Sequence, residues 1–407
     1  MYILFIIVVI TSLAVFLVRK RHFDFLTIYF LLLLLYNIST IFGLVYVPSN
    51  GTMTYPNEYI YLVSIFPFIF ITFFLLLKQP VQNEIKLNEI KYQFRNDNNI
   101  IIFSKLLFIL FIVVFVYNIS TALNSSTKKE LLDNNNSLSL VLNAIPALAI
   151  MVAYLARRKK MLYFYFFLVV ILFFFGGRAR LASAVLCLLL LAYYNKPIKI
   201  IARKWLIVGG FFGLLLIIAG KRLYGYVLGY GLLEGVSRWY TDFDSSFLLT
   251  GSEFVTNTAI LNAVMEKDFS ISWQDIFTSL FSILPIPVSL FGFNSGIFNE
   301  RFQNTLFSDI EYGMAYSIWA EGYSWLGLLG IIMFSFIIPL SLFKLWNLYN
   351  KYANTIYGPL LILIGFTIAF WCHRNSVGTI LANIRNLLYP TLILIFCVSF
   401  INKFIRK

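Results

Sequence analysis

The chain has 407 residues, of which 60% are hydrophobic and only 12% are charged, and its formal net charge is +14. Soluble domains carry about 25% charged residues, so this composition excludes a soluble globular protein and indicates an integral membrane protein. The aromatic content of 18% and the mean hydropathy of +0.82 agree with that class.

Apolar runs long enough to cross about 30 Å of hydrocarbon recur along the whole chain. We predict an all-α polytopic fold of about eleven transmembrane helices, forming a single integral membrane domain over residues 1–407. The predicted spans are residues 3–18, 25–45, 60–77, 100–123, 138–155, 161–175, 181–194, 205–219, 315–343, 356–371 and 387–401.

The Lys and Arg residues define an orientation, because cytoplasmic loops of membrane proteins retain an excess of them. Alternate loops and the C-terminal tail hold 21 of the 32 basic residues. This asymmetry predicts an N-terminus outside and a C-terminus in the cytoplasm. The positive charge then reflects topology and attraction to anionic lipid headgroups, and nucleic acid is not an expected partner.

The run from Met161 to Tyr194 has two interpretations. A single long helix would cross once and would place the basic residues that follow it on the outer side. Two helices joined by a tight turn at residues 176–180 keep those residues in the cytoplasm. We therefore expect the hairpin.

One connection is much longer than the others, from Lys221 to Glu311. The predicted orientation places it outside, where we expect chemistry or recognition. Its part from Trp273 to Phe293 is apolar but contains Pro285 and Pro287, so we expect a re-entrant or interfacial segment and not a crossing.

Arginines are concentrated on the predicted outer side, where they are normally scarce. The planar guanidinium stays charged and binds phosphate oxygens through two hydrogen bonds, so a diphosphate on a lipid carrier is an expected ligand. The alternative is that these side chains only reach out to lipid headgroups. The candidate diphosphate-binding residues are Arg178, Arg180, Arg222, Arg238, Arg301 and Arg374.

The candidate acid–base residues are Glu321, His373 and Asp242. Glu321 lies in an apolar stretch, where an unpaired carboxylate is costly and a raised pKa would suit a base that deprotonates a sugar hydroxyl. The alternative for Glu321 is a structural ion pair with an arginine. His373 lies beside Arg374 at the predicted outer end of a span.

Metal binding is not expected. The sequence Asp242-Phe243-Asp244 is similar to the DxD motif of metal-dependent sugar transferases, but matches of three residues are frequent by chance. The three cysteines, Cys187, Cys372 and Cys397, have no metal-ligand spacing and are expected to fill the apolar core.

Two stretches resemble the O-antigen and oligosaccharide repeat-unit polymerases of the Wzy type. The first is the proline break Leu284-Pro285-Ile286-Pro287 with the aromatic Phe291-Gly292-Phe293, and the second runs from Tyr316 through Glu321 to Gly330. The turn Gly176-Gly177-Arg178 is similar to a glycine-rich arginine turn of that family. Two family features are missing: an arginine directly after the loop proline, and paired Arg-x10-Gly motifs.

The resemblance implies transfer of a growing glycan from undecaprenyl diphosphate to the hydroxyl of an incoming lipid-linked repeat unit. It implies a metal-independent glycosyltransferase without a cofactor, acting in O-antigen lipopolysaccharide or capsule-like polysaccharide biosynthesis. The implied partners are the lipid-linked oligosaccharide, membrane lipids and a chain-length regulator. The arginines would stabilise the leaving diphosphate, and an acid or His373 would activate the acceptor.

Two other classes stay open. A lipid-linked glycan flippase or other transporter predicts ionisable residues deep in several spans and an internal repeat, and neither is visible in the sequence. An O-antigen ligase of the related family would be expected to carry a histidine in the large loop, and Lys221 to Glu311 contains none.

Overall fold

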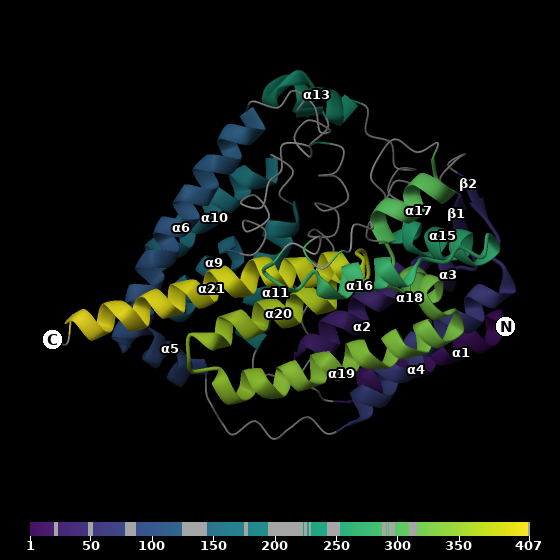
Figure 1. The fold of residues 1–407 in the computed structure, drawn as a ribbon, viewed down its shortest axis with the longest axis horizontal. Coiled ribbons are helices and arrows are strands. Elements are labelled where there is room, and N and C mark those ends of the chain that lie inside the picture. Colours follow the sequence, from purple (N-terminus) through teal and green to yellow (C-terminus); the bar gives the residue numbers. More distant parts are fainter. Residues whose placement is uncertain are drawn as a thin grey trace. The chain divides into compact units, whose positions relative to one another are not determined.

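The computed structural model describes residues 1–19, 23–47, 52–77, 87–123, 145–174, 178–193, 223, 226–227, 229–241, 253–286, 290, 292, 298–308 and 316–405. These residues form apolar helices and one short β-hairpin (Figure 1). They fall into two compact units. The first contains Met1–Val81, Ser246–Leu348 and Gly365–Arg385, and the second contains Gln82–Ser245, Tyr349–Ile364 and Asn386–Lys407.

The N-terminal part of the first unit is built around two long helices. Helix α1 (Tyr2–Val18) packs along α4 (Glu58–Leu76), and α4 also contacts α2 (Phe25–Tyr36). Asp24 begins α2 by accepting a hydrogen bond from the Thr27 N–H at 2.9 Å. After Asn37 the chain forms the short α3 (Ile38–Ile41) and the antiparallel strands β1 (Val45–Val47) and β2 (Thr52–Thr54).

Several other elements of the first unit pack on α15 (Glu253–Glu266). This helix contacts α2, α3, β1, α17 (Phe298–Leu306) and α18 (Ile318–Leu326). Between α15 and α17 lies α16 (Trp273–Phe281), whose first turn is closed by a capping box between Ser272 and Asp275. In the parts that the structure describes, the long segment predicted to be one extramembrane connection therefore contains the helices α15, α16 and α17.

A sharp turn separates α18 from α19 (Leu328–Tyr352) at Gly327. Gly327 has φ +60° and ψ −139°, a conformation that only glycine adopts readily. Immediately after the turn the backbones of the two helices touch, because a Cβ placed on Gly330 would lie 1.8 Å from the Gly322 carbonyl oxygen. The prediction of one continuous span over residues 315–343 was wrong, since this turn ends the first helix.

The second unit is organised around α9 (Ile145–Leu155), in which every residue except Tyr154 is buried. Helices α5 (Leu87–Asn96), α6 (Asn98–Leu123), α10 (Lys159–Phe174) and α11 (Arg178–Tyr193) all contact it. Helices α10 and α11 also contact each other, as expected for a hairpin and not for one long helix. A separate exposed helix, α13, covers Leu232–Thr241.

The expected membrane class is consistent with the helices. Among the described residues four helices are long and apolar enough to cross a membrane: Glu58–Leu76, Asn98–Ser120, Leu328–Tyr352 and Val377–Phe404. Helices α1, α2, α9 and α20 (Tyr357–Trp371) and most of α11 are apolar but shorter. The prediction of a span over 25–45 was wrong, because α2 ends at Tyr36. The predicted span over 205–219 lies outside the described residues.

We expect Gly330→Val to prevent folding, because the added side chain would enter the space of the Gly322 carbonyl and neither backbone can move without unpacking α18 from α19. Size-exclusion chromatography of a fluorescent fusion in detergent should show loss of the monodisperse peak. Leu329→Ala is the matched control, since Leu329 is 59% exposed. An unchanged Gly330→Val profile would contradict the tight crossing.

Candidate functional site

The most unusual buried group in the first unit is the carboxylate of Glu321 on α18, which has no exposed surface. Its Oε2 atom accepts a hydrogen bond of 2.6 Å from the backbone N–H of Val377, the first residue of α21 (Val377–Ile405). The first turn of a helix has free N–H groups and a partial positive charge, so this position favours a carboxylate. Its Oε1 atom has no hydrogen-bond partner among the described residues.

Two opposing effects act on the acidity of Glu321. Burial raises the pKa of the carboxyl to about 8, and the hydrogen bond from Val377 acts in the opposite direction. Glu321 lies on α18, which precedes the membrane-length helix α19 and is not itself of membrane-spanning length. With a pKa of about 8 the carboxyl is mostly protonated at pH 7, and the carboxylate, the form that can act as a general base, is the minor species.

The turn between α20 and α21 carries His373 and Arg374, and hydrogen bonds from two other segments hold it. The Tyr316 N–H donates to the Arg374 carbonyl at 2.9 Å, and the side-chain amide of Asn257 on α15 donates to the His373 carbonyl. Because α18 begins directly after Tyr316, the structure brings Glu321, His373 and Arg374 together around one helix N-terminus. Their role in a reaction stays a prediction.

His373 is fully buried beside two aromatic rings of α2. Its ring centre lies 4.8 Å from that of Tyr29 and 5.6 Å from that of Tyr36, on which it is stacked. Burial lowers the pKa of His373 to about 3, while the Tyr29 backbone acts in the opposite direction. His373 is therefore neutral near pH 7. The guanidinium of Arg374 lies 5.2 Å from the ring centre of Trp371.

A small cavity lies within the first unit. Its volume is about 10 Å³, roughly the space of one water molecule. Neither Glu321 nor His373 lines it, although Ser317 on the same helix as Glu321 does. The lining residues are Tyr36, Asn37, Val63, Ser64, Pro67, Asn257, Thr258, Leu261, Ser317 and Trp319.

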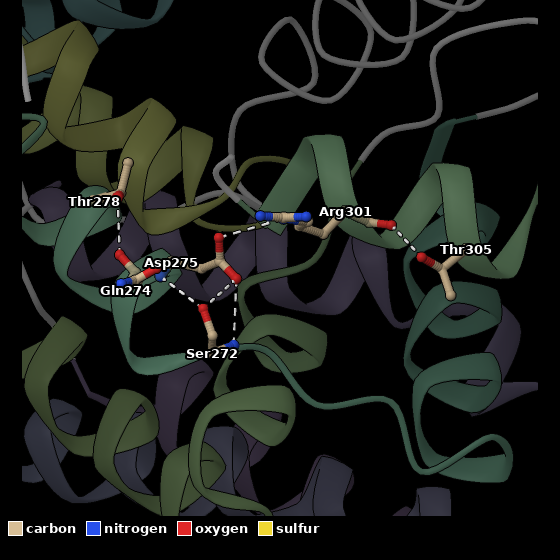
Figure 2. A network of polar contacts seen from close by, with 6 residues as sticks. All are labelled: Ser272, Gln274, Asp275, Thr278, Arg301 and Thr305. Atoms are coloured by element: carbon tan, nitrogen blue, oxygen red, sulfur yellow. Dashed lines mark hydrogen bonds and ion pairs between the residues drawn. The ribbon is translucent and has the colours of Figure 1, made fainter. Parts of the chain in front are cut away.

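Arg301 on α17 is held by Asp275 on α16 (Figure 2). Its Nε atom donates to Asp275 Oδ1 at 3.4 Å, while the other carboxylate oxygen accepts from the Ser272 hydroxyl at 2.7 Å. The Asp275 side chain is 5% exposed and that of Arg301 is 52% exposed. The carboxylate therefore fixes one edge of the guanidinium and leaves much of its surface open to a ligand.

Arg238 lies on the exposed helix α13 of the second unit. It donates to Glu234 Oε1 through Nε at 3.1 Å and Nη2 at 2.8 Å, and its guanidinium covers the ring of Tyr230 at 3.9 Å. Its planar fork is thus engaged within its own helix. Asp242 and Arg222 lie outside the described residues, and Arg178 and Arg180 lie in α11 with side chains that are not described.

Within the described part of the chain, no group of three or more His, Cys, Asp or Glu side chains could hold a metal ion. The DxD motif at Asp242 lies outside those residues. Cys187, Cys372 and Cys397 are free thiols, two of them buried, in agreement with the expected core role.

No protein-family model, curated protein or solved structure matches this chain.

Sequence reasoning missed two polar residues of this region, Asn257 and Ser317. Both line the cavity, both are at most 5% exposed, and Asn257 Oδ1 and Ser317 Oγ have no hydrogen-bond partner among the described residues. Their only sequence signal is a neutral polar residue within a largely apolar stretch, and many serines and asparagines of the chain share it.

Glu321 and His373 make opposite contributions to stability as pH changes. The folded state holds the Glu321 proton up to about pH 8 and the unfolded state loses it near 4.5, so its contribution to stability falls as pH rises through that interval. Burial of neutral His373 makes stability rise with pH between about 3 and 6.5. Above 6.5 the histidine is neutral in both states, and the glutamate dominates.

We therefore expect the thermal denaturation midpoint in detergent to decrease between pH 6.5 and pH 8. Glu321→Gln should flatten that decrease, because glutamine keeps an oxygen for the Val377 N–H and cannot titrate. His373→Asn is the control and should leave the slope above pH 6.5 unchanged. Equal slopes in wild type and Glu321→Gln would show that Glu321 is ionised in the folded protein.

Proposed function

We propose that this protein is a metal-independent membrane glycosyltransferase of the O-antigen polymerase type. It joins undecaprenyl-diphosphate-linked oligosaccharide repeat units into an O-antigen or capsule-like polysaccharide at the outer face of the bacterial inner membrane. The leaving group is a lipid diphosphate and the acceptor is a sugar hydroxyl.

The observation that carries this proposal is the surface around α16 and Arg301. Helix α16 turns most of its apolar side chains outward and most of its polar ones inward, although Ile276 is buried and Gln274 is exposed. Trp273, Phe277 and Leu280 are 64%, 43% and 42% exposed, whereas Asp275 is 3% exposed. A lipid chain is the natural neighbour of such a face. Arg301 beside it, anchored through Nε, has terminal N–H groups suited to a lipid-linked phosphate.

The residues around the N-terminus of α21, Glu321, His373 and Arg374, support the acid–base half of the reaction. Glu321 has a carboxyl whose two protonation states are both accessible, and a helix N-terminus stabilises its charged form. Arg374 adds positive charge in the neighbouring turn. In this proposal the arginines stabilise the negative charge that develops on the diphosphate, and Glu321 receives the proton of the acceptor hydroxyl. Neutral His373 serves to pack the turn against α2.

The proposed topology follows the distribution of basic residues, with eleven spans, the N-terminus outside and the C-terminus in the cytoplasm. In a cysteine-free background we expect Leu233→Cys on α13 to react with a membrane-impermeant maleimide in intact spheroplasts, because its side chain is 86% exposed. Arg157→Cys should react only after permeabilisation. The opposite labelling pattern would invert the proposed orientation.

We expect Arg301→Ala to slow polymerisation by purified protein on the order of a hundredfold, because the leaving diphosphate loses a charged hydrogen-bond donor. Arg301→Lys should restore only part of the rate, since an ammonium group cannot form the two parallel bonds of a guanidinium. The measurement is the length distribution of glycan made from lipid-linked repeat units.

Lys267→Ala is the control for loss of positive charge in the same unit, because Lys267 is exposed and its ammonium donates to the Leu306 carbonyl at 3.5 Å. It should leave the glycan unchanged. Wild-type polymer from Arg301→Ala at normal expression would remove Arg301 from the site.

The same purified protein decides between the three candidate classes. A polymerase extends lipid-linked repeat units on the lipid carrier, in the presence of EDTA. A ligase would transfer glycan only when a lipid A core acceptor is added, and a flippase would move the lipid across vesicles without changing its length. Absence of any polymer with active, folded protein would overturn the proposed function.

A further inference from the structure

Helix α21 carries two charged residues, Arg385 and Lys403. They are 18 positions apart in the sequence, so about 27 Å of helix separates them. That length is close to the ~30 Å thickness of the hydrocarbon core of a bilayer. Charged side chains of membrane helices reach toward the headgroup layers, so one of these residues fits each surface. The spacing therefore favours a position for Arg385 at the level of the lipid phosphates.

Arg385 also contacts the segment that follows α16. Its Nη1 atom donates a hydrogen bond to the Leu284 carbonyl at 3.4 Å, and Leu284 lies just beyond Phe281, the last residue of α16. Arg385 and Leu284 are both half-buried. The C-terminal end of α16 therefore shares the depth of Arg385.

The N-terminal end of α16 is held by other contacts. The Ile271 N–H donates to the Ser324 carbonyl on α18 at 3.3 Å. Asp275 in the first turn binds Arg301 on α17 (Figure 2). Because a short helix behaves as a rigid rod, two fixed ends define its tilt. Releasing the C-terminal end should therefore move that end and leave the other in place.

Helix α16 is too short to cross a bilayer and presents an apolar face outward. Its 9 residues span about 14 Å, roughly half of the hydrocarbon thickness. Trp273, Phe277 and Leu280 lie on one side of the helix, because they follow one another at spacings of four and three residues. They are 64%, 43% and 42% exposed. A helix of this kind lies in the plane of the interface, with its apolar face toward the acyl chains.

We propose that α16 lies flat at the boundary between headgroups and acyl chains, and that Arg385 is the positioning residue that holds it at that depth. The partner of its apolar face is the lipid of the bilayer. This depth follows from α21 and from the contacts at the two ends of α16, whatever the reaction. A consequence for the substrate rests on the proposed glycosyl transfer: the chain of the lipid carrier packs along α16, and its diphosphate meets Arg301.

Spin labels test the depth of α16 without any substrate. Labels at Trp273→Cys, Leu280→Cys and Ile393→Cys, each in a cysteine-free background, are compared in lipid vesicles. The measurement is their collision rate with oxygen, which is enriched in hydrocarbon, and with a water-soluble nickel chelate. Ile393 lies near the midpoint between Arg385 and Lys403 and is 62% exposed, so its label marks the centre of the bilayer. We expect equal depth at positions 273 and 280, both shallower than position 393.

Three results would overturn the proposed depth. A re-entrant α16 would put the labels at positions 273 and 280 about 10 Å apart in depth, since seven residues of helix separate them. Labels shielded from both oxygen and nickel would show that another protein or a second copy of this chain covers the face. Labels open to nickel and poor in oxygen would show that the face lies in water.

Arg385→Ala tests the anchor. We expect the label at position 280 to change depth and the label at position 273 to stay, because the contacts with α17 and α18 still hold that end. Arg385→Lys should restore the depth, since an ammonium group also donates a hydrogen bond and also stays in the headgroup layer. Lys403→Ala, at the other end of α21, is the matched control and should move neither label.

Arg385→Gln gives the same comparison where alanine impairs folding, because glutamine removes the charge and is too short to reach as far as arginine. Unchanged depth at position 280 in both Arg385→Ala and Arg385→Gln would remove Arg385 from its positioning role. The comparison of positions 273 and 280 needs neither variant.

The consequence for the substrate is tested on polymerisation. We expect Arg385→Ala to raise KM for lipid-linked repeat units about tenfold with little change in kcat, because the tilted helix loses contact with the lipid chain while Arg301 and Glu321 keep their places. Arg385→Lys should recover most of the affinity. A shifted label with unchanged KM would refute the role in substrate binding and leave the anchor standing. Labels at the expected depths in a wild-type sequence that makes no polymer would refute the proposed function alone.

Discussion

The contact between the Glu321 carboxylate and the Val377 N–H governs the architecture of the first unit. It joins the short helix α18 to the beginning of α21, and the turn before α21 is in turn fixed by Tyr316 and Asn257. A buried carboxylate without such a partner would be strongly unfavourable. The helix N-terminus supplies compensation without a counter-charge, so the group remains able to gain and lose a proton. The burial of this carboxylate and its protonation state thus depend on the same hydrogen bond.

Much of this region could be predicted from the sequence, and the reason is the rarity of charge in apolar segments. Glu321 and His373 are conspicuous because so few residues around them are ionisable. Ser317 and Asn257 could not be found, since neutral polar residues are common throughout the chain. Contacts between residues far apart in the sequence could not be predicted either. Arg301 and Asp275 are 26 residues apart, and the fold brings Arg301 Nε to 3.4 Å from Asp275 Oδ1.

Hydropathy predicted the positions of most helices and failed where a helix ends inside an apolar run. At Asn37 the chain leaves α2 although apolar residues continue to Val45, because the side-chain amide turns back onto the Leu33 carbonyl. At Gly327 a single backbone conformation divides one apolar stretch into α18 and α19. An average over many residues does not respond to one dihedral angle, and both breaks border the candidate site.

The hydrogen bonds that join Glu321 to Val377 and Asn257 to His373 connect residues that are synthesised at different times. Val377 lies 56 residues after Glu321, and His373 lies 116 residues after Asn257. At about 5–20 residues per second, each earlier residue leaves the ribosome several seconds before its partner. During that interval Glu321 has no helix N-terminus to accept from and must be protonated or kept near water. Assembly of the centre of the first unit is therefore a late event, completed only when the beginning of α21 has been synthesised.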